Sequence, residues 1–308
     1  MKSEPSGEVI VVGGGVIGMA TALVLARRGR RVRVWSREPA GRTTSAVAGA
    51  LWWPYRIDPV ERVGAWSVES LRRYEEWAGR PEATGVRMVE GVHAGTRLAG
   101  LGAWAGEVAG LRDTEAGLAA RLPLIDMPAH LAWLRGELAA AGVAVEERAV
   151  SSLRDVPAPV VVNCAGLGAR DLVPDAAVRP VRGQLVVVEN PGIRTWFTAA
   201  DPASDATTYF FPQPGGLILG GTAEEDAWSL EPDPAVAEAI VKRCAQVRPE
   251  IAGARVLGHR VGLRPARPAV RVEREVTGSG RVLVHNYGHG GAGVTVAWGC
   301  AQEAADLV

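Results

Sequence analysis

Two glycine-rich stretches, one near each end of the chain, have residue types and spacings that suit an anionic ligand. The first is Gly13-x-Gly15-x-x-Gly18, and the second is the run NYGHGGAG over residues 286–293. Each follows a short apolar run and precedes a longer apolar run of helical character. Backbone amides at a helix N-terminus can approach a phosphate closely where glycines leave out the side chains. Together the two stretches predict one ligand clamped between both ends of the chain.

A third stretch, residues 42–56, combines hydroxyls, small residues and aromatic rings in the sequence RTTSAVAGALWWPYR. The hydroxyls of Thr43, Thr44 and Ser45 could bind phosphate oxygens, the small residues let backbone lie against a flat ring, and the aromatic residues supply apolar walls. A capped helix start followed by aromatic core residues explains the same pattern equally well. Spacing alone leaves both interpretations open.

The first glycine motif lies in a favourable context. A buried strand is expected over residues 8–12, a helix up to Arg28 with Gly29 after it, and a second strand over 31–35. This βαβ unit of about thirty residues predicts a dinucleotide-binding site. Ser36 and Arg37 stand where an acidic residue usually binds the ribose. An arginine there can accommodate a 2′-phosphate, so NADP remains open at this point.

Composition limits the other possibilities. With 308 residues and 47% hydrophobic content, the chain can form two domains. Its formal net charge is zero, which gives no reason to expect a nucleic-acid partner. The cysteines Cys164, Cys244 and Cys300 are far apart in the sequence and form no CxxC motif. They predict reduced thiols in a cytoplasmic protein and no metal site.

An uncharged run over residues 9–26 has the length of a membrane span or signal peptide. Its four glycines would weaken a spanning helix, and the acidic Glu4 and Glu8 do not suit the basic start of a signal peptide. The sequence therefore predicts no membrane insertion.

Further along, the pattern predicts an α/β arrangement that changes into an antiparallel sheet. Residues 94–122 are rich in glycine and alanine and show little pattern. Cys164-Ala165-Gly166 forms a tight turn after a buried strand, which is where an α/β sheet places ligands. Helices are expected from Pro59 to about residue 78, over 126–141, and over 234–247 with Asp233 as N-cap. Strands are expected over 87–92, 143–147, 160–163, 186–189, 195–199, 207–211, 217–220 and 282–285, with long strands between 254 and 273.

Taken together, these motifs resemble those of the FAD-dependent D-amino acid oxidases and their relatives, the D-aspartate oxidases. The resemblance rests on ordered motifs along nearly the whole chain. They are VVGGGVIGMATAL, TTSAVAGALWWPY, VVVNCAGLGARDL, RPVRGQLVVVE, TTYFFP with LGGT, VGLRPARPAVRVERE and HNYGHGGAGVTVAWGCAQEA. It implies that the dinucleotide is FAD and that Arg37 is a departure near the adenosine ribose.

The resemblance also implies a substrate site. Arg264 falls on the family's carboxylate-binding arginine, Tyr209 on its tyrosine, and Gly291 on the backbone carbonyl that faces the substrate amine. A planar guanidinium with a phenol donor is well suited to a carboxylate. Without the family, Arg264 would be interpreted as a solvated strand residue and Tyr209 as a half-buried sheet aromatic. A second family tyrosine, on a lid, corresponds to Asp205, which puts a conventional lid in doubt.

Other positions carried over from the family line the substrate pocket or hold the cofactor. The pocket positions are Leu51, Trp53 and Phe211. The positions expected around FAD are Gly13, Gly15, Val16, Ile17, Gly18, Ser36, Arg37, Thr43, Thr44, Ser45, Gly49, Ala50, Leu51, Cys164, Ala165, Arg264, Gly288, Gly290, Gly291, Ala292, Gly293, Val294 and Thr295. The resemblance gives neither His285 nor His289 the role of a general base.

The expected fold is a Rossmann-like FAD-binding α/β domain with an inserted antiparallel-sheet substrate domain. The first comprises residues 1–56, 143–182 and 274–308, and the second 57–142 and 183–273. The expected reaction is oxidation of neutral or apolar D-amino acids by hydride transfer to FAD and O2, giving 2-oxo acids, ammonia and hydrogen peroxide. The alternatives are a D-aspartate oxidase, a glycine oxidase or related dehydrogenase, and a non-enzymatic flavoprotein module. A homodimer is left open.

Overall fold

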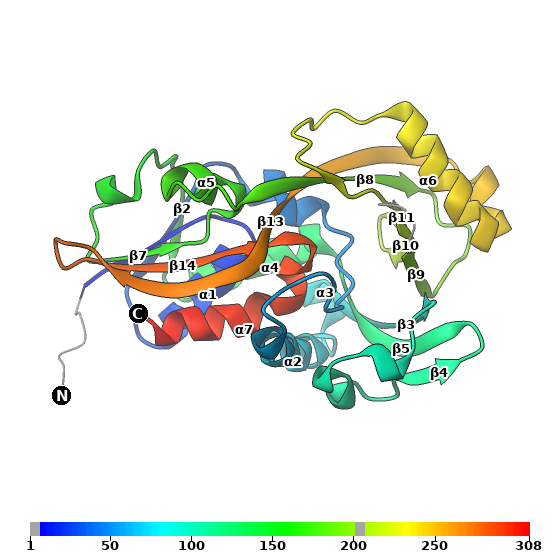
Figure 1. Cartoon of the computed structure of the whole chain (residues 1–308), viewed down its shortest axis with the longest axis horizontal. Helices are drawn as coiled ribbons and strands as arrows, with labels where there is room; N and C mark the ends of the chain where they lie inside the picture. The colour runs from blue at the N-terminus through cyan, green and yellow to red at the C-terminus, as the bar shows by residue number, and fades with distance from the viewer. Residues whose placement is uncertain (1–6, 201–206) are drawn as a thin grey trace.

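A computed structural model describes residues 7–200 and 207–308 of the chain (Figure 1). Within this part, 14 strands join in one mixed sheet, with helices against it. The order across the sheet is β4-β5-β3-β9-β10-β11-β8-β13-β14-β7-β1-β2-β6, and β12 pairs with β8. The expected combination of an α/β fold with an antiparallel sheet is confirmed. The expected domain boundaries stay a prediction.

One end of the sheet is parallel and carries both glycine stretches. Its strands are β6 (Ala144–Glu147), β2 (Val32–Ser36), β1 (Val9–Val12), β7 (Val160–Asn163) and β14 (Val282–His289). Strand β1 is buried on both faces, since Val9 and Val11 join one apolar cluster while Ile10 and Val12 join another. Burial on both faces explains why β1 is an unbroken apolar run, as parallel strands usually are.

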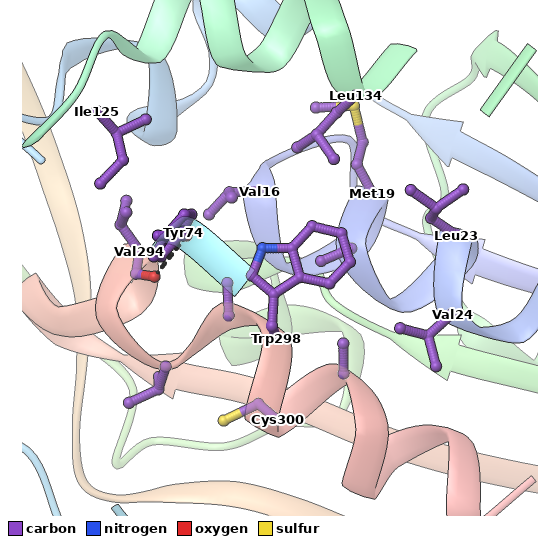
Figure 2. Close-up of a cluster of buried hydrophobic side chains, with 14 of the residues drawn as sticks. Val16, Met19, Leu23, Val24, Tyr74, Ile125, Leu134, Val294, Trp298 and Cys300 are labelled. Carbon is purple, nitrogen blue, oxygen red and sulfur yellow. Dashed lines mark hydrogen bonds between the residues drawn. The ribbon is translucent and has the colours of Figure 1, made fainter. Parts of the chain in front are cut away.

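The helices that follow the two glycine stretches, α1 (Val16–Arg27) and α7 (Gly293–Asp306), pack side by side. Figure 2 shows the indole of Trp298 on α7 beside Met19 of α1, in a buried apolar cluster. At the other ends, Arg28 forms an ion pair of 2.6 Å with Asp306. The helices therefore run in the same direction, and their N-termini, with the glycine stretches, lie at one end.

Two further helices complete this layer. They are α2 (Val60–Trp77) and α4 (Met127–Ala140). The hydroxyl of Tyr74 on α2 donates to the carbonyl of Val294 at 2.9 Å, which fixes the first turn of α7 (Figure 2). The short helices are α3 (Pro81–Thr84) and α5 (Ala169–Leu172).

The other end of the sheet is mainly antiparallel. It contains β8 (Arg179–Val188), β9 (Trp196–Ala200), β10 (Thr207–Gln213), β11 (Gly216–Gly220), β12 (Glu224–Glu225) and β13 (Val256–Val276). Helix α6 (Pro234–Val247) covers it, and Ile240 and Cys244 on that helix pack with Phe210 of β10. The expected N-cap is confirmed, because Asp233 Oδ1 accepts from the amides of Ala235 and Val236.

Strand β13 connects the two ends of the sheet. It has 21 residues and pairs with β8 on one side and with β14 on the other. Its pairing with β14 shifts register between Ala266 and Arg271. Arg264 lies in the part paired with β8, close to that irregularity.

Three features differ from the expectation. The strand expected over residues 186–189 is β8, which begins at Arg179 and ends at Val188. Residues 94–122, which show little pattern, contain β4 (Arg112–Thr114) and most of β5 (Gly117–Ile125), which pairs with β3 (Val86–Ala94). Every residue of β5 except Arg121 is buried, so the alternation that marks a half-buried strand is missing. Strand β14 also continues to His289 rather than ending at residue 285, because residues 286 and 287 pair with β13.

No helix in the described residues has the length and apolar character that a membrane crossing requires.

Candidate active site

The first glycine motif brings α1 directly against the ends of β1 and β7. Gly13 has a φ of 125°, and a Cβ on it would lie 2.2 Å from the carbonyl oxygen of Cys164. A Cβ on Gly18 would lie 1.9 Å from the carbonyl oxygen of Gly13. Both positions therefore require glycine for packing, as the turn of a dinucleotide-binding unit does.

Gly15 differs, because its missing side chain leaves open space at the N-terminus of α1. Among the described residues, a Cβ on Gly15 would have Ser45 Oγ, at 3.0 Å, as its single close neighbour. The amide of Val16 donates to that same hydroxyl at 3.0 Å. A helix N-terminus with a glycine and a neighbouring hydroxyl fits the pyrophosphate of a dinucleotide.

The second glycine stretch is a short turn between β14 and α7. A 3-10 turn spans Gly290–Ala292, and Gly288 and Gly290 have φ of 88° and 53°. Gly291 is exposed, between the half-buried Gly290 and the buried Ala292. The first turn of α7 is hydrogen-bonded to residues 42–56, the stretch rich in hydroxyls and aromatic rings. Thr295 Oγ1 donates to the carbonyl of Trp53 at 3.0 Å and accepts from its amide at 3.1 Å.

A buried polar network ties these loops together. Asn286 Nδ2 on β14 donates to Thr21 Oγ1 on α1 at 3.1 Å, and Cys164 Sγ lies 3.9 Å from the same oxygen. Asn286 Oδ1 is hydrogen-bonded to His289 Nε2 at 3.1 Å. Thr21 in turn donates to the carbonyl of Ile17 at 2.7 Å. Satisfied buried networks of this kind hold backbone in one arrangement.

The same burial removes charge from the groups around the loops. Burial lowers the pKa of His289 to about 3 and raises the pKa of Cys164 to about 12. Burial is also the main reason why the pKa of His285 is lowered, and its Nε2 lies 3.5 Å from a carboxylate oxygen of Glu275. His289 is thus neutral at pH 7 and engaged with Asn286, which suits a structural part in the loop.

Arg264 defines a second set of contacts. A Cβ on Gly183, in β8, would lie 2.3 Å from Arg264 Nη2, so the guanidinium rests directly on the backbone of that glycine. Arg264 Nη1 donates to the carbonyl of Thr222 at 2.9 Å. A Cβ on Gly291 would lie 3.4 Å from Arg264 Cδ. Arg264 therefore lies between the antiparallel sheet and the second glycine turn.

Tyr209 on β10 lies in the same place. Its ring rests on glycines, since a Cβ on Gly220 would lie 2.3 Å from its hydroxyl oxygen and one on Gly221 would lie 2.7 Å from it. The ring stacks on Phe211, with centroids 4.7 Å apart. Burial raises the pKa of Tyr209, and the nearby Arg264 guanidinium offsets part of that rise. The phenol is therefore a neutral donor beside a cation.

The predicted pocket positions Leu51 and Trp53 and the predicted cofactor position Gly49 have neighbours on other elements. Gly49 faces the Phe211 ring, which a Cβ there would approach to 2.8 Å. Leu51 forms an isolated bridge with Leu124 of β5. Trp53 packs between two rings, with its centroid 3.8 Å from that of His93 and 4.9 Å from that of Trp104.

Four of the predicted cofactor positions also have partners within the protein. Ser36 Oγ donates to the carbonyl of Glu38 at 2.6 Å, and Thr43 Oγ1 donates to that of Ala40 at 2.7 Å. Arg37 is 73% exposed and lies 3.6 Å from the Glu38 carboxylate. Thr44 Oγ1 donates to the carbonyl of Leu263 at 3.1 Å. The lid position Asp205 falls outside the described residues.

Sequence reasoning missed several neighbours of the site. Gly183 and Thr222 touch Arg264, and His93 and Thr198 lie in register with Tyr209 across β3, β9 and β10. Burial lowers the pKa of His93 to about 3, which leaves it neutral. Gly183 could have been found from residues 179–189, RPVRGQLVVVE, where a glycine interrupts a strand. Within the described residues, no group of three or more His, Cys, Asp or Glu could hold a metal ion.

A Rossmann-like unit, two converging glycine turns and an antiparallel sheet define a class, the dinucleotide-dependent oxidoreductases. Comparison with known proteins is more specific, because the sequence profile of the family described as "FAD dependent oxidoreductase" matches residues 8–307. The chain belongs to this family, and its cofactor is FAD.

The similar proteins include two bacterial relatives. A D-amino-acid oxidase of Streptomyces coelicolor is 68% identical, with 100% of this chain and 98% of the relative covered. A D-amino-acid oxidase of Rubrobacter xylanophilus is 47% identical, with 100% and 97% covered. The resemblance drawn from the motifs is thereby confirmed. A solved structure of glycine oxidase from Bacillus cereus has a TM-score of 0.79 at 19% identity over 98% of this chain and 94% of that one, which supports the fold.

Proposed function

We propose that this protein is a D-amino acid oxidase that oxidises neutral D-amino acids to 2-oxo acids, with release of ammonia and hydrogen peroxide. The observation that carries the proposal is the convergence of Arg264, Tyr209 and Gly291 from three separate elements. A cation, a neutral phenol donor and an exposed backbone turn suit a carboxylate next to an amine. The names of the two bacterial relatives support the same reaction.

In this proposal, Arg264 and Tyr209 bind the α-carboxylate. Nη1 donates to the Thr222 carbonyl and the guanidinium is also hydrogen-bonded to the Tyr209 side chain, so Arg264 and Tyr209 would bind the two carboxylate oxygens as one joined set of donors. The carbonyl of Gly291 accepts from the substrate amine, which fixes both groups attached to the α-carbon and so selects one enantiomer.

The cofactor would be held by the glycine turns. Gly13, Gly15 and Val16, with Ser45, would hold the pyrophosphate at the start of α1, and the 290–292 turn would lie against the flavin end. Bound FAD supplies the two-electron acceptor, which amino-acid side chains cannot provide. The chain's own contribution is to bind, orient and shield the substrate.

The proposal assigns no proton transfer to a side chain. The histidines nearest the site, His289 and His93, are buried and neutral with pKa values of about 3. The Cys164 thiol is held protonated by burial. A substrate that enters with its amine unprotonated and loses the α-hydrogen as hydride requires no protein base, which agrees with these groups.

The preference for neutral side chains follows from the pocket walls. Leu51, Trp53 and Phe211 are apolar, and a second substrate carboxylate would lose its hydration among them, at a cost of several kcal/mol. Arg56 and Arg194, which could have supplied a second cation, are exposed. The alternative is a D-aspartate oxidase, and a cation reaching the pocket would favour it.

The test is a substrate series with peroxide detection. The proposal predicts higher kcat/KM for D-leucine, D-methionine, D-valine and D-phenylalanine than for D-aspartate, D-glutamate or glycine at one pH, with stoichiometric hydrogen peroxide. A preference for D-aspartate would show that the protein is a D-aspartate oxidase instead. Turnover with an artificial acceptor but without peroxide would indicate a dehydrogenase.

Assembly and location are separate proposals. Trp228 and Leu230 are 54% and 60% exposed on one loop, and a homodimer would remove such apolar side chains from water. Sedimentation velocity of Trp228→Glu beside wild type tests this. A cytoplasmic location agrees with three buried, unpaired cysteines among the described residues. Cell fractionation of the native host tests it.

A further inference from the structure

A loop that sequence reasoning left without a role touches the proposed carboxylate site. Residues 222–233, here named the strap, connect β11 to α6 and include β12. The first strap residue, Thr222, accepts from Arg264 Nη1 through its carbonyl at 2.9 Å. Its hydroxyl accepts from the amide of Gln184 at 3.0 Å. Thr222 thus joins Arg264 to the strand β8 on which the guanidinium rests.

The middle of the strap is held by Arg182, a buried arginine whose side chain is 4% exposed. Its Nε donates to the carbonyl of Ser229 at 2.9 Å, and its Nη2 to that of Glu231 at 2.6 Å. Its Nη1 donates to a carboxylate oxygen of Glu224 at 2.7 Å. Because all three nitrogens of Arg182 are engaged within the protein, this cation is not available to a substrate.

The end of the strap is fixed through Gln184. Its Nε2 donates to the carbonyl of Asp233 at 2.7 Å, and its Oε1 accepts from the amide of Asp233 at 2.8 Å. The same Oε1 accepts from Arg182 Nη2 at 3.0 Å. Arg182 and Gln184 therefore form one buried unit that holds the strap in the middle and at its end.

We propose that Arg182 is a positioning residue for Arg264, acting through the strap and the Thr222 carbonyl. This inference rests on the proposed function, in which Arg264 binds the substrate carboxylate. Side chains alternate along β8, so Arg182 and Gln184 point to one face while Gly183 faces Arg264 on the other. Arg182 thus stabilises the strap from the face opposite the substrate. A guanidinium held in one orientation before binding avoids an entropic cost on binding.

The test measures carboxylate affinity apart from turnover. Purified holoenzyme is titrated with benzoate, which carries a carboxylate but no oxidisable amine, and binding is followed by calorimetry and by the flavin absorbance. Arg182→Met should raise the benzoate Kd roughly tenfold, leave FAD content unchanged, and raise KM for a D-amino acid more than it lowers kcat. In an Arg264→Met background, Arg182→Met should cause no further loss of affinity, because both act through one contact.

Two other variants keep the result interpretable. Arg281 is the matched control, because its Nη1 also donates to two backbone carbonyls, those of Leu153 and Arg154, in a different part of the chain. Arg281→Met should keep the wild-type Kd. If Arg182→Met does not fold, Thr222→Val, which removes the hydroxyl bonded to Gln184, should still weaken benzoate binding a few-fold.

Failure of the positioning role of Arg182 can be distinguished from failure of the proposed function. Equal benzoate affinity in wild type, Arg182→Met and Thr222→Val would overturn the positioning role alone. An equal loss from Arg182→Met with and without Arg264 would also overturn it, since the effect would then be independent of Arg264. A wild-type holoenzyme that does not bind benzoate would overturn the proposed function and this inference with it.

Discussion

The guanidinium of Arg264 lies directly on the backbone of Gly183, where a Cβ would come within 2.3 Å of Nη2. A methyl group at this position must displace the guanidinium, because Gly183 is in the interior of β8 and its backbone cannot easily move. This contact explains why the strand carries a glycine there.

Gly183→Ala should therefore lower kcat/KM by roughly tenfold or more while FAD remains bound, because a displacement of about 1 Å at a binding group is costly. Steady-state kinetics and the ratio of flavin to protein absorbance measure the two effects. Gly258 on β13 is the control, because a Cβ there has no neighbour within 4 Å among the described residues. Wild-type kinetics in Gly183→Ala would show that the guanidinium is not held in this place.

Arg264→Met removes the cation itself. Loss of one partner of a partly buried charge pair costs about 3–5 kcal/mol, so kcat/KM should fall on the order of a hundredfold or more. The protein should remain yellow, because the guanidinium is not needed to hold the pyrophosphate. Arg260→Met, on the same strand, provides the comparison. Near-wild-type turnover of Arg264→Met would contradict the proposed substrate site.

Gly15→Val tests the proposed pyrophosphate site at the start of α1. The Cβ of valine meets Ser45 Oγ at 3.0 Å and otherwise enters the space assigned to the pyrophosphate, so the protein should fold but purify without colour. Gly136→Val, in the exposed part of α4, should keep FAD. Stoichiometric FAD in Gly15→Val would show that this loop does not hold the cofactor.

The buried histidines predict a pH dependence of stability. Burial lowers the pKa of His130 to about 4, below the ordinary value of about 6.5. Between these pH values the unfolded chain binds more protons, so the free energy of unfolding falls as pH falls through this window. One such proton corresponds to about 1.4 kcal/mol per pH unit.

His130→Gln should therefore flatten the slope of unfolding free energy against pH between 4 and 6.5. Denaturant unfolding at several pH values measures that slope separately from the overall loss of stability that the substitution causes. His259→Gln, at an exposed position, is the control. An unchanged slope in His130→Gln would mean that His130 has nearly the same pKa in the folded and the unfolded chain.

Local patterns predicted much of the fold. The first βαβ unit, the Asp233 cap and helix 234–247 follow from turn residues and periodicity, which act over a few positions. Strand β5 could not be found this way, because burial on both faces erases the alternation. The continuation of β14 depends on pairing with β13, which is a tertiary contact.

The residues that bind the substrate could be predicted from the sequence, but the residues that hold them in place could not. Arg264 and Tyr209 were identified from motifs of a known family, and the structure brings them together. Arg182 and Thr222 are separated by many residues in sequence and become linked only when β12 pairs with β8. The local partners of Ser36 and Arg37 likewise depend on the conformation after β2, which residue types do not determine.

The most direct test of the central claim is anaerobic mixing of the purified holoenzyme with each enantiomer of leucine, followed by flavin absorbance. The account predicts that D-leucine bleaches the yellow colour, that L-leucine does not, and that readmitted oxygen restores the colour with formation of hydrogen peroxide. Bleaching by L-leucine, or no bleaching by any neutral D-amino acid, would contradict it.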